Sequence, residues 1–262
     1  MMRFRYWLLI CSLLVVGGCQ TGTLPNPNDP NDVGSLTPEN MKDQFTSISE
    51  MLQVRLAHRQ ITNQEFKELL GQAADHLLKG FTPDKAEPAT AWQIAEIMIN
   101  AKHWQDAEQV LVSAIEWAKI NHNEDRFVND TLRLARVRAE LGQVSQAVKT
   151  ARTVFSIPAY AAVPILYATQ SEIVPAGRGK GHDLELGKLL EDAIAIDLKA
   201  TVNPDTIPGQ GFLSARPYHV YESWVLVTEL YTNANRPDLA ALAQKKVVEY
   251  AAYSHRGGHL RV

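Results

Sequence analysis

The residues best suited to chemistry lie in the C-terminal half of the chain. The run Gly177-Arg178-Gly179-Lys180-Gly181-His182 alternates glycine with basic side chains. Glycine lets backbone N–H groups approach an anion, and the two cations before a helix could hold a phosphate. The Gly-Lys-Ser/Thr ending of a nucleotide-binding P-loop is absent, so a solvated flexible loop is the simpler interpretation. Arg178, Lys180 and His182 remain candidate binding residues.

Two pairs of side chains, one of histidine with glutamate and one of two histidines, could take part in metal binding or acid–base catalysis. His219 and Glu222 are three residues apart and would share one face of a helix. No second pair at matching spacing accompanies them, so a surface pair is the simpler interpretation. His255 and His259 flank two glycines, which oppose a helix there. The sequence therefore predicts no catalytic residue, no metal site and no cofactor.

An aromatic run follows at helical spacing, formed by Tyr218, Tyr221, Trp224 and Tyr231. Such a run can pack into the core of a helical hairpin, or it can form a binding ridge for an extended peptide or a sugar. Core packing is the simpler interpretation. Tyr218 and Tyr221 are candidate binding residues because they could line a groove with the segment 200–217.

The N-terminus has the pattern of a cleaved secretory signal. Arg3 and Arg5 precede the apolar run Tyr6–Val16, which is too short to span a bilayer comfortably. Only Cys11 and Cys19 occur in the chain, so residues 20–262 can hold no disulfide, no thiolate metal site and no cysteine nucleophile.

The end of this signal, Val16-Gly17-Gly18-Cys19, resembles the bacterial lipobox. The resemblance implies cleavage before Cys19 and lipidation of that cysteine, and two or three acyl chains anchor a protein stably to a membrane. The alternative is an ordinary secretion signal in which Cys19 is incidental. By resemblance to the lipoproteins of diderm bacteria, Gln20 implies transport to the outer membrane. We therefore expect a lipid-anchored protein of the bacterial cell envelope, facing the periplasm in a diderm host.

Three segments differ in composition and define the expected domains. Residues 1–18 are the signal peptide. Residues 19–36 are rich in proline, asparagine and glycine and form a lipid-anchored flexible tether. Residues 37–262 form the helical-repeat domain.

Charge argues against nucleic acid as a partner. The 262-residue chain has a formal net charge of −3. Loss of the signal removes two of the 26 basic side chains, Arg3 and Arg5, and none of the 29 acidic ones, so the mature chain carries −5. A nucleic-acid-binding protein usually has a basic excess or a basic face.

A repeated helical hairpin organises the body of the chain. Residues 91–118 form two amphipathic helices joined near 101–104, with small residues where the helices must approach closely. The pattern returns forty residues later at 131–151, and again near 224–240. A hairpin repeated at such a period predicts an α-solenoid, in which each pair buries its apolar edge against its neighbours.

These hairpins resemble tetratricopeptide repeats. The resemblance is carried by three sets of positions: Ala95, Ala107 and Ala114; Ala135 and Ala147; and Gly142 before the turn. It covers about half of the mature chain and is degenerate, because the step is forty residues where the family uses about 34. Arg138 also stands where the family prefers a large apolar residue. The resemblance implies an all-α fold, a right-handed α-solenoid with a concave surface that binds a protein or peptide.

The remaining elements follow from caps, periodicity and breakers. We expect helices that begin at Thr37-Pro38, at the capping box Thr62–Glu65 and at Pro88. Pro164 permits only a short or kinked helix, residues 174–183 read as a loop, and a helix follows through Leu198. Residues 200–217 show no periodicity and read as a long loop. The last hairpin spans 218–232 and 237–253. Arg133, Arg136 and Arg138 should form a solvated face paired with Glu124, Asp125 and Glu140.

The leading hypothesis is a non-enzymatic, membrane-anchored lipoprotein that holds an envelope protein or peptide on its helical-repeat surface. An alternative is an envelope protein that handles a glycan or small ligand, possibly as an enzyme, with Arg178, His182, His219 and Glu222 between the 177–182 and 200–217 loops. A purely structural spacer is a third hypothesis. The sequence does not determine the oligomeric state.

Overall fold

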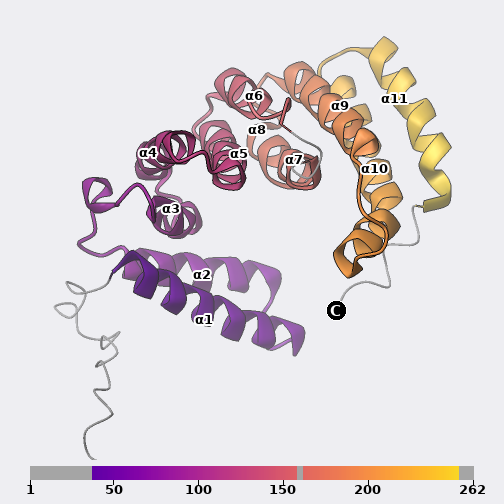
Figure 1. The fold of residues 1–262 in the computed structure, drawn as a ribbon. Coiled ribbons are helices and arrows are strands. Elements are labelled where there is room, and N and C mark those ends of the chain that lie inside the picture. Colours follow the sequence, from indigo (N-terminus) through magenta and orange to yellow (C-terminus); the bar gives the residue numbers. More distant parts are fainter. Residues whose placement is uncertain (1–36, 158–161, 254–262) are drawn as a thin grey trace, which may run out of the picture.

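The computed structural model describes residues 37–157 and 162–253, and these residues form an all-α fold (Figure 1). Within these ranges, five helical hairpins follow one another. Their helices are α1 (Pro38–Ala57), α2 (Asn63–Leu77), α3 (Ala91–Asn100), α4 (Trp104–Ile120), α5 (Glu124–Glu140), α6 (Val144–Arg152), α7 (Ala162–Ala168), α8 (Val174–Gly177), α9 (Asp183–Lys199), α10 (Ile207–Asn233) and α11 (Pro237–Tyr250). Short turns η2 (Pro83–Lys85), η4 (Thr169–Ile173) and η5 (Ala251–Tyr253) complete the set.

The hairpins stack in chain order into a curved arc (Figure 1). Contacts run from each helix to the next, α3 to α4, α4 to α5 and α5 to α6, and then from α6 to α9, α9 to α10 and α10 to α11. Helices α3, α5, α7 and α10 lie nearer the inner side of the arc, and α4, α6, α9 and α11 lie on its outer side (Figure 1). The predicted α-solenoid is confirmed.

The forty-residue step from α4 to α6 is also confirmed, and a step of 39 residues extends it one hairpin further to α9. Helices α4, α6 and α9 begin at Trp104, Val144 and Asp183. Two residues before each of these starts, the backbone turns through a positive φ, at Lys102, Gly142 and Gly181. This left-handed residue ends the preceding helical segment and reverses the chain. The turn at 101–104, which has no glycine, therefore uses a lysine in the glycine conformation.

Small residues mark the close helix–helix contacts, as predicted. All five alanines of the proposed framework are fully buried, namely Ala95, Ala107, Ala114, Ala135 and Ala147, and Ala91 at the start of α3 is buried as well. Two large apolar clusters fill the stack. One spans α1 to α5, the other spans α5 to α11, and they meet on α5 at Leu134 and Ala135. The helix α5 therefore belongs to both halves of the core.

Helix starts agree with the predicted caps. The Thr62 hydroxyl accepts from the Glu65 N–H at 3.2 Å, and the Glu65 carboxylate accepts from the Thr62 N–H at 2.7 Å. Thr37 caps α1 through the Asn40 N–H. The third helix begins at Ala91 and not at Pro88.

The prediction that residues 200–217 form a long loop is wrong. Only residues 200–206 connect α9 to α10, and α10 then runs for 27 residues through Pro217. The Thr206 hydroxyl caps the new helix by accepting from the Gly209 N–H at 3.1 Å. A Cβ at Gly209 would lie 1.9 Å from the Asn203 carbonyl oxygen, so the turn requires glycine. Arg216 then donates to the Ala200 carbonyl at 2.9 Å and fixes this part of α10 to the end of α9.

The predicted loop 174–183 is also partly helical. The short helix expected around Pro164 is present as α7, and it continues through the π-helical turn η4 into α8. A Cβ at Gly177 would lie 3.2 Å from side-chain atoms of Val144 and Leu186, so α8 ends in tight contact with α6 and α9. The loop proper spans residues 178–182.

Several expectations lie outside the described residues. These are the signal peptide 1–18, the tether from Cys19 to residue 36, and the terminal histidines His255 and His259. Within the described ranges, no helix is both long enough and apolar enough to cross a bilayer.

Candidate binding sites on the helical stack

The basic loop 178–182 ties helices together. The Lys180 ammonium donates to the carbonyl oxygens of Ala139 and Glu140 at 2.8 and 3.1 Å. These carbonyls belong to the last turn of α5, where the carbonyl oxygens have no N–H partner from a further helical turn, although that of Ala139 also accepts from the Gly142 N–H at 3.0 Å. Lys180 thus stabilises the end of α5, and its charge opposes the negative end of that helix dipole.

The other two candidates in this loop also have partners inside the stack. Arg178 forms an ion pair with Glu229 of α10. His182 Nδ1 lies 3.2 Å from both the Ser145 hydroxyl and the Glu185 carboxylate. Burial disfavours the charge on Glu185, but the hydrogen bonds from Ser145 and His182 outweigh it, so the pKa of Glu185 lies below its usual value.

Phosphate binding by this loop would need free backbone donors. The Gly179 N–H already donates to the Asp183 carboxylate at 2.9 Å. That carboxylate occupies the N-terminus of α9, where an anion would otherwise be stabilised. A second anion would meet the negative charge of Asp183, so the arrangement favours a helix cap over a phosphate cradle.

The structure does not bring the two candidate loops together. Loop 178–182 precedes α9 and segment 200–206 follows it, so the 17 residues of α9 separate them by about 25 Å. Tyr218 and Tyr221 are half-buried on α10. His219 is exposed, its ring 5.7 Å from that of Tyr218, and Glu222 is half-buried. No group of three or more His, Cys, Asp or Glu that could hold a metal ion occurs among the described residues.

The aromatic run of α10 divides between core and surface. Tyr231 is fully buried, and its hydroxyl donates to the Glu191 carboxylate at 2.6 Å. Burial and this acceptor both raise the pKa of Tyr231. Trp224 packs against the same apolar cluster. The core interpretation therefore holds for Tyr231 and Trp224.

A cavity of about 450 Å³ lies between α7, η4, the end of α9 and the first half of α10. We call it the α7–α10 cavity. It is lined by Leu166, Tyr167, Gln170, Asp197, Gly211, Phe212, Ala215, Arg216 and His219. The sequence pattern did not reveal it, because the cavity depends on residues 207–217 being helical.

An ion pair forms part of its wall. Asp197 has 1% of its side chain exposed, and its Oδ2 lies 3.5 Å from Arg216 Nε. Burial raises the pKa of Asp197 to about 6, although the Arg216 guanidinium acts in the opposite direction. In the described part of the chain, neither Asp197 Oδ2 nor Arg216 Nε has a hydrogen-bond partner. The sequence does contain one signal for this site, because Asp197 continues the buried stripe of Ala193 and Ile194.

A second polar network joins α3 and α5. Asp130 is fully buried, and its carboxylate accepts from Arg126 at 2.8 Å and from Arg133 at 3.1 Å. The two guanidinium groups lie 4.8 and 5.7 Å from the centre of the Trp92 ring, within the range of cation–π attraction. The carboxylate thus fixes two cations against one aromatic ring.

The arginine-rich face of α5 is paired, but not with the carboxylates that the sequence suggested. Arg133 pairs with Asp130, Arg136 with Glu172 at 3.4 Å, and Arg138 with Glu108 at 2.9 Å. Arg138 also donates to the Thr150 hydroxyl at 2.6 Å. Two of these partners come from other helices, so the pairs join α5 to α4 and η4 and do not stabilise α5 alone.

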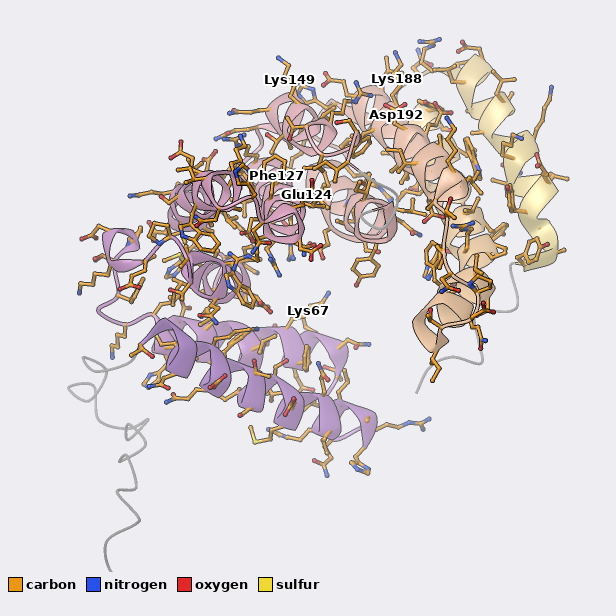
Figure 2. All side chains as sticks on the ribbon, viewed as in Figure 1. Lys67, Glu124, Phe127, Lys149, Lys188 and Asp192 are labelled. Carbon is orange, nitrogen blue, oxygen red and sulfur yellow. The ribbon has the colours of Figure 1, made fainter. Side chains whose placement is uncertain are left out.

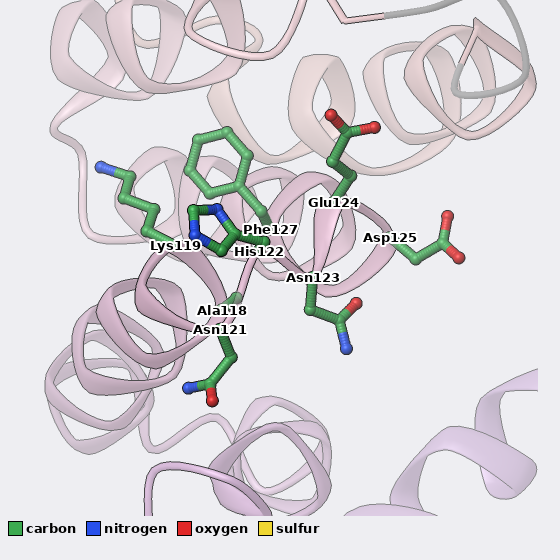
Figure 3. A pocket seen from close by; sticks show the side chains of 8 residues that line it. All are labelled: Ala118, Lys119, Asn121, His122, Asn123, Glu124, Asp125 and Phe127. Atoms are coloured by element: carbon green, nitrogen blue, oxygen red, sulfur yellow. The ribbon is translucent and has the colours of Figure 1, made fainter.

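An open hollow of about 560 Å³ surrounds the turn between α4 and α5 (Figure 3). Its lining comes from residues 118–127 alone, including His122, Asn123 and Phe127. The Lys119 ammonium lies 5.2 Å from the centre of the Phe127 ring. His122 supplies the positive φ of this turn, and Asn123 caps α5. These residues build the turn itself, so the α7–α10 cavity is the stronger candidate for a ligand.

Comparison with known proteins adds little to this description. No family model and no curated protein matches the sequence. Two solved structures resemble the fold: a Podosopora anserina protein described as a kinesin light chain with nearly identical TPR-like repeats, and a single-residue variant of it. Each is 20% identical over 82% of this chain and 98% of that chain, with TM-scores of 0.44 and 0.45. The fold assignment therefore rests on the helix pairing described above.

Proposed function

We propose that this chain is a non-enzymatic adaptor that holds an extended segment of another protein along the inner side of its arc. The observation that carries the proposal is the single curved stack, whose inner helices α3, α5, α7 and α10 come from four successive hairpins (Figure 1). Solenoids use such extended concave surfaces to bind partners.

The side chains of these inner helices suit a mixed polar and aromatic contact. Trp92 is held by Arg126 and Arg133, and Arg136 and Tyr167 are partly exposed on α5 and α7. Tyr167 has 58% of its surface exposed, which is high for a large aromatic side chain. Aromatic residues and arginine are enriched where proteins bind one another.

The N-terminal pattern supports an anchored form of this adaptor. In the proposal, Cys19 carries the lipid, residues 20–36 are the tether, and residues 37–262 present the arc away from the envelope membrane. About seventeen residues in an extended conformation can reach roughly 50 Å, enough to separate the arc from the membrane surface.

An in-cell crosslink of the full-length protein, followed by capture and mass spectrometry, tests the proposal. We expect one dominant envelope partner, and we expect its yield to fall when Cys19→Ala removes the anchor. Capture of the same partner at equal yield by the Cys19→Ala variant would reject the anchored form and leave the adaptor. No reproducible partner with either protein would reject the adaptor.

A further inference from the structure

The α7–α10 cavity differs from a hollow at a single turn because its walls come from four separate elements. Leu166 and Tyr167 belong to α7, Gln170 to η4, Asp197 to α9, and the remaining lining to α10. One wall is a π-helical turn, a feature that is frequent at functional sites. The volume of about 450 Å³ lies within the range of small-molecule sites.

The α10 wall leaves this space open. A Cβ built on Gly211 would meet no atom within 4 Å. Glycine inside a helix weakens it by about 0.5–1 kcal/mol relative to alanine. Gly211 therefore leaves room beside α10, and it does so at the cost of a less stable helix.

The lining also restricts the chemistry of an occupant. Leu166, Phe212 and Ala215 present apolar atoms, and Tyr167 adds a second aromatic ring. The guanidinium of Arg216 already stacks 4.6 Å from the centre of the Phe212 ring and neutralises Asp197 at 3.5 Å. A charged guest would lose its hydration shell on entering the cavity and would find no free opposite charge there. The site therefore favours an uncharged group.

One polar atom in this wall has no hydrogen-bond partner among the described residues. Asp197 is almost fully buried, and its Oδ2 accepts no hydrogen bond in the described structure. A buried acceptor without a partner costs about 1–3 kcal/mol, which a guest with an N–H or O–H group could recover. Gln170 and His219 add polar groups to the lining.

We propose that the α7–α10 cavity binds an uncharged aromatic group with a hydrogen-bond donor, supplied by a tryptophan side chain of the partner segment. Indole combines a flat apolar ring with one N–H group, which would face Asp197 while the ring packs against Phe212 and Tyr167. The assignment of this side chain to the partner segment rests on the proposed function. In that proposal the segment binds along the inner side of the arc, where both α7 and α10 lie (Figure 1).

Equilibrium dialysis with the full-length protein tests this site without any partner. The probes are indole, indene and N-acetyl-tryptophanamide; indene has nearly the shape of indole but no N–H group. We expect one saturable site per chain for indole and for N-acetyl-tryptophanamide, with indene bound about tenfold more weakly. The Asp197→Asn variant should reduce this preference for indole over indene.

A matched pair of variants on α10 locates the binding. Gly211→Leu should fill the cavity, and it should lower indole affinity at least about tenfold. Ser214→Leu places the same side chain at an exposed position three residues away that does not line the cavity, and it should leave affinity unchanged. Circular dichroism of both variants verifies that the helices are intact.

Four results would overturn the proposal. The first is no saturable binding of indole, and the second is equal affinity for indole and indene. The third is a Gly211→Leu variant, folded by circular dichroism, that binds as the wild type does. Binding of indole but not of N-acetyl-tryptophanamide would reject a partner side chain and point to a free aromatic compound. Because these probes need no partner, failure here leaves the adaptor proposal standing, and failure of partner capture leaves the cavity result standing.

Discussion

The two halves of the arc use the same hairpin but pack it differently. From α3 to α6 the forty-residue step is regular, and buried alanines such as Ala95 and Ala135 bring the helices into close contact. From α7 to α10 the chain contains a π-helical turn, an internal Pro217 and the cavity beside Gly211. Regular packing provides stability, whereas the departures from it provide space and unpartnered polar atoms. We therefore expect the first region to govern folding and the second to govern recognition.

The largest effect should come from a cavity created in the regular half. Leu111 on α4 is fully buried, so Leu111→Ala should cost about 2–5 kcal/mol of unfolding free energy. Leu213 on α10 is 36% exposed, so Leu213→Ala should cost less than about 1 kcal/mol. Urea unfolding followed by circular dichroism measures both, and equal losses would contradict the close packing assigned to Leu111 in the regular half.

The next effect concerns the charge of Asp197 in the irregular half. The pKa of this group is about 6 in the folded chain and about 4 when unfolded, so the folded state disfavours its ionised form. The contribution of Asp197 to stability is complete below about pH 4 and is lost as the pH rises through about 6. Asp197→Asn removes this titration.

The unfolding free energy of Asp197→Asn, minus that of the wild type, should therefore increase by about 2 kcal/mol between about pH 4 and about pH 7. Measuring both proteins at both pH values cancels the titration of all other groups. A difference that stays constant, or that falls with rising pH, would contradict the assigned direction of the Asp197 pKa.

A smaller effect contrasts two glycines: one that packs against the C-terminal end of α10, and one beside the cavity near its N-terminal end. A Cβ at Gly187 of α9 would lie 2.6 Å from the Tyr231 ring, so Gly187→Ala must displace that ring and should cost about 1–3 kcal/mol. Gly211→Ala, beside the cavity, meets no atom within 4 Å and should stabilise the helix by about 0.5–1 kcal/mol. Thermal unfolding of the two variants gives the comparison. Equal destabilisation would mean that no open space borders Gly211.

The smallest effect lies in a turn of the regular half. Lys102 has a φ of 62°, a conformation in which glycine has no steric penalty. Lys102→Gly should therefore stabilise the chain by about 0.5–1 kcal/mol, whereas Gly142→Ala, at the equivalent turn with φ 80°, should destabilise it. Chemical unfolding of both variants tests whether the two turns are equivalent. A destabilised Lys102→Gly variant would show that they are not.

The regular half could be predicted from sequence because local signals and packing agree there. The capping box at Thr62, the alanine framework and the forty-residue step each point to the hairpins that form. The first part of α10 could not be predicted from sequence, because Gly209, Gly211 and Pro217 all disfavour a helix locally. Tertiary contacts override them: Arg216 holds the Ala200 carbonyl and stacks on Phe212.

The candidate site was predicted less well than the fold. The glycine-rich basic pattern suggests phosphate binding by Arg178, Lys180 and His182, but the structure gives each of them a partner within the stack. The sequence alone does not identify Asp130 and Asp197 as buried, paired carboxylates. A buried carboxylate on a helix cannot be distinguished from a surface carboxylate until the position of its arginine partner is known. Long-range pairs of this kind depend on the fold and not on spacing.

The most direct test of the central claim is site-specific photo-crosslinking in the cell. Figure 2 shows Lys67, on α2 beside the inner helix α3, directed toward the inner side of the arc, and Lys149 and Lys188 directed away from its outer side. All three lysines are exposed on helices, so a photo-reactive amino acid at each position is a matched comparison. The adaptor account predicts a discrete crosslinked partner from position 67 and none from positions 149 and 188. A partner captured from the two outer positions and not from position 67 would contradict it.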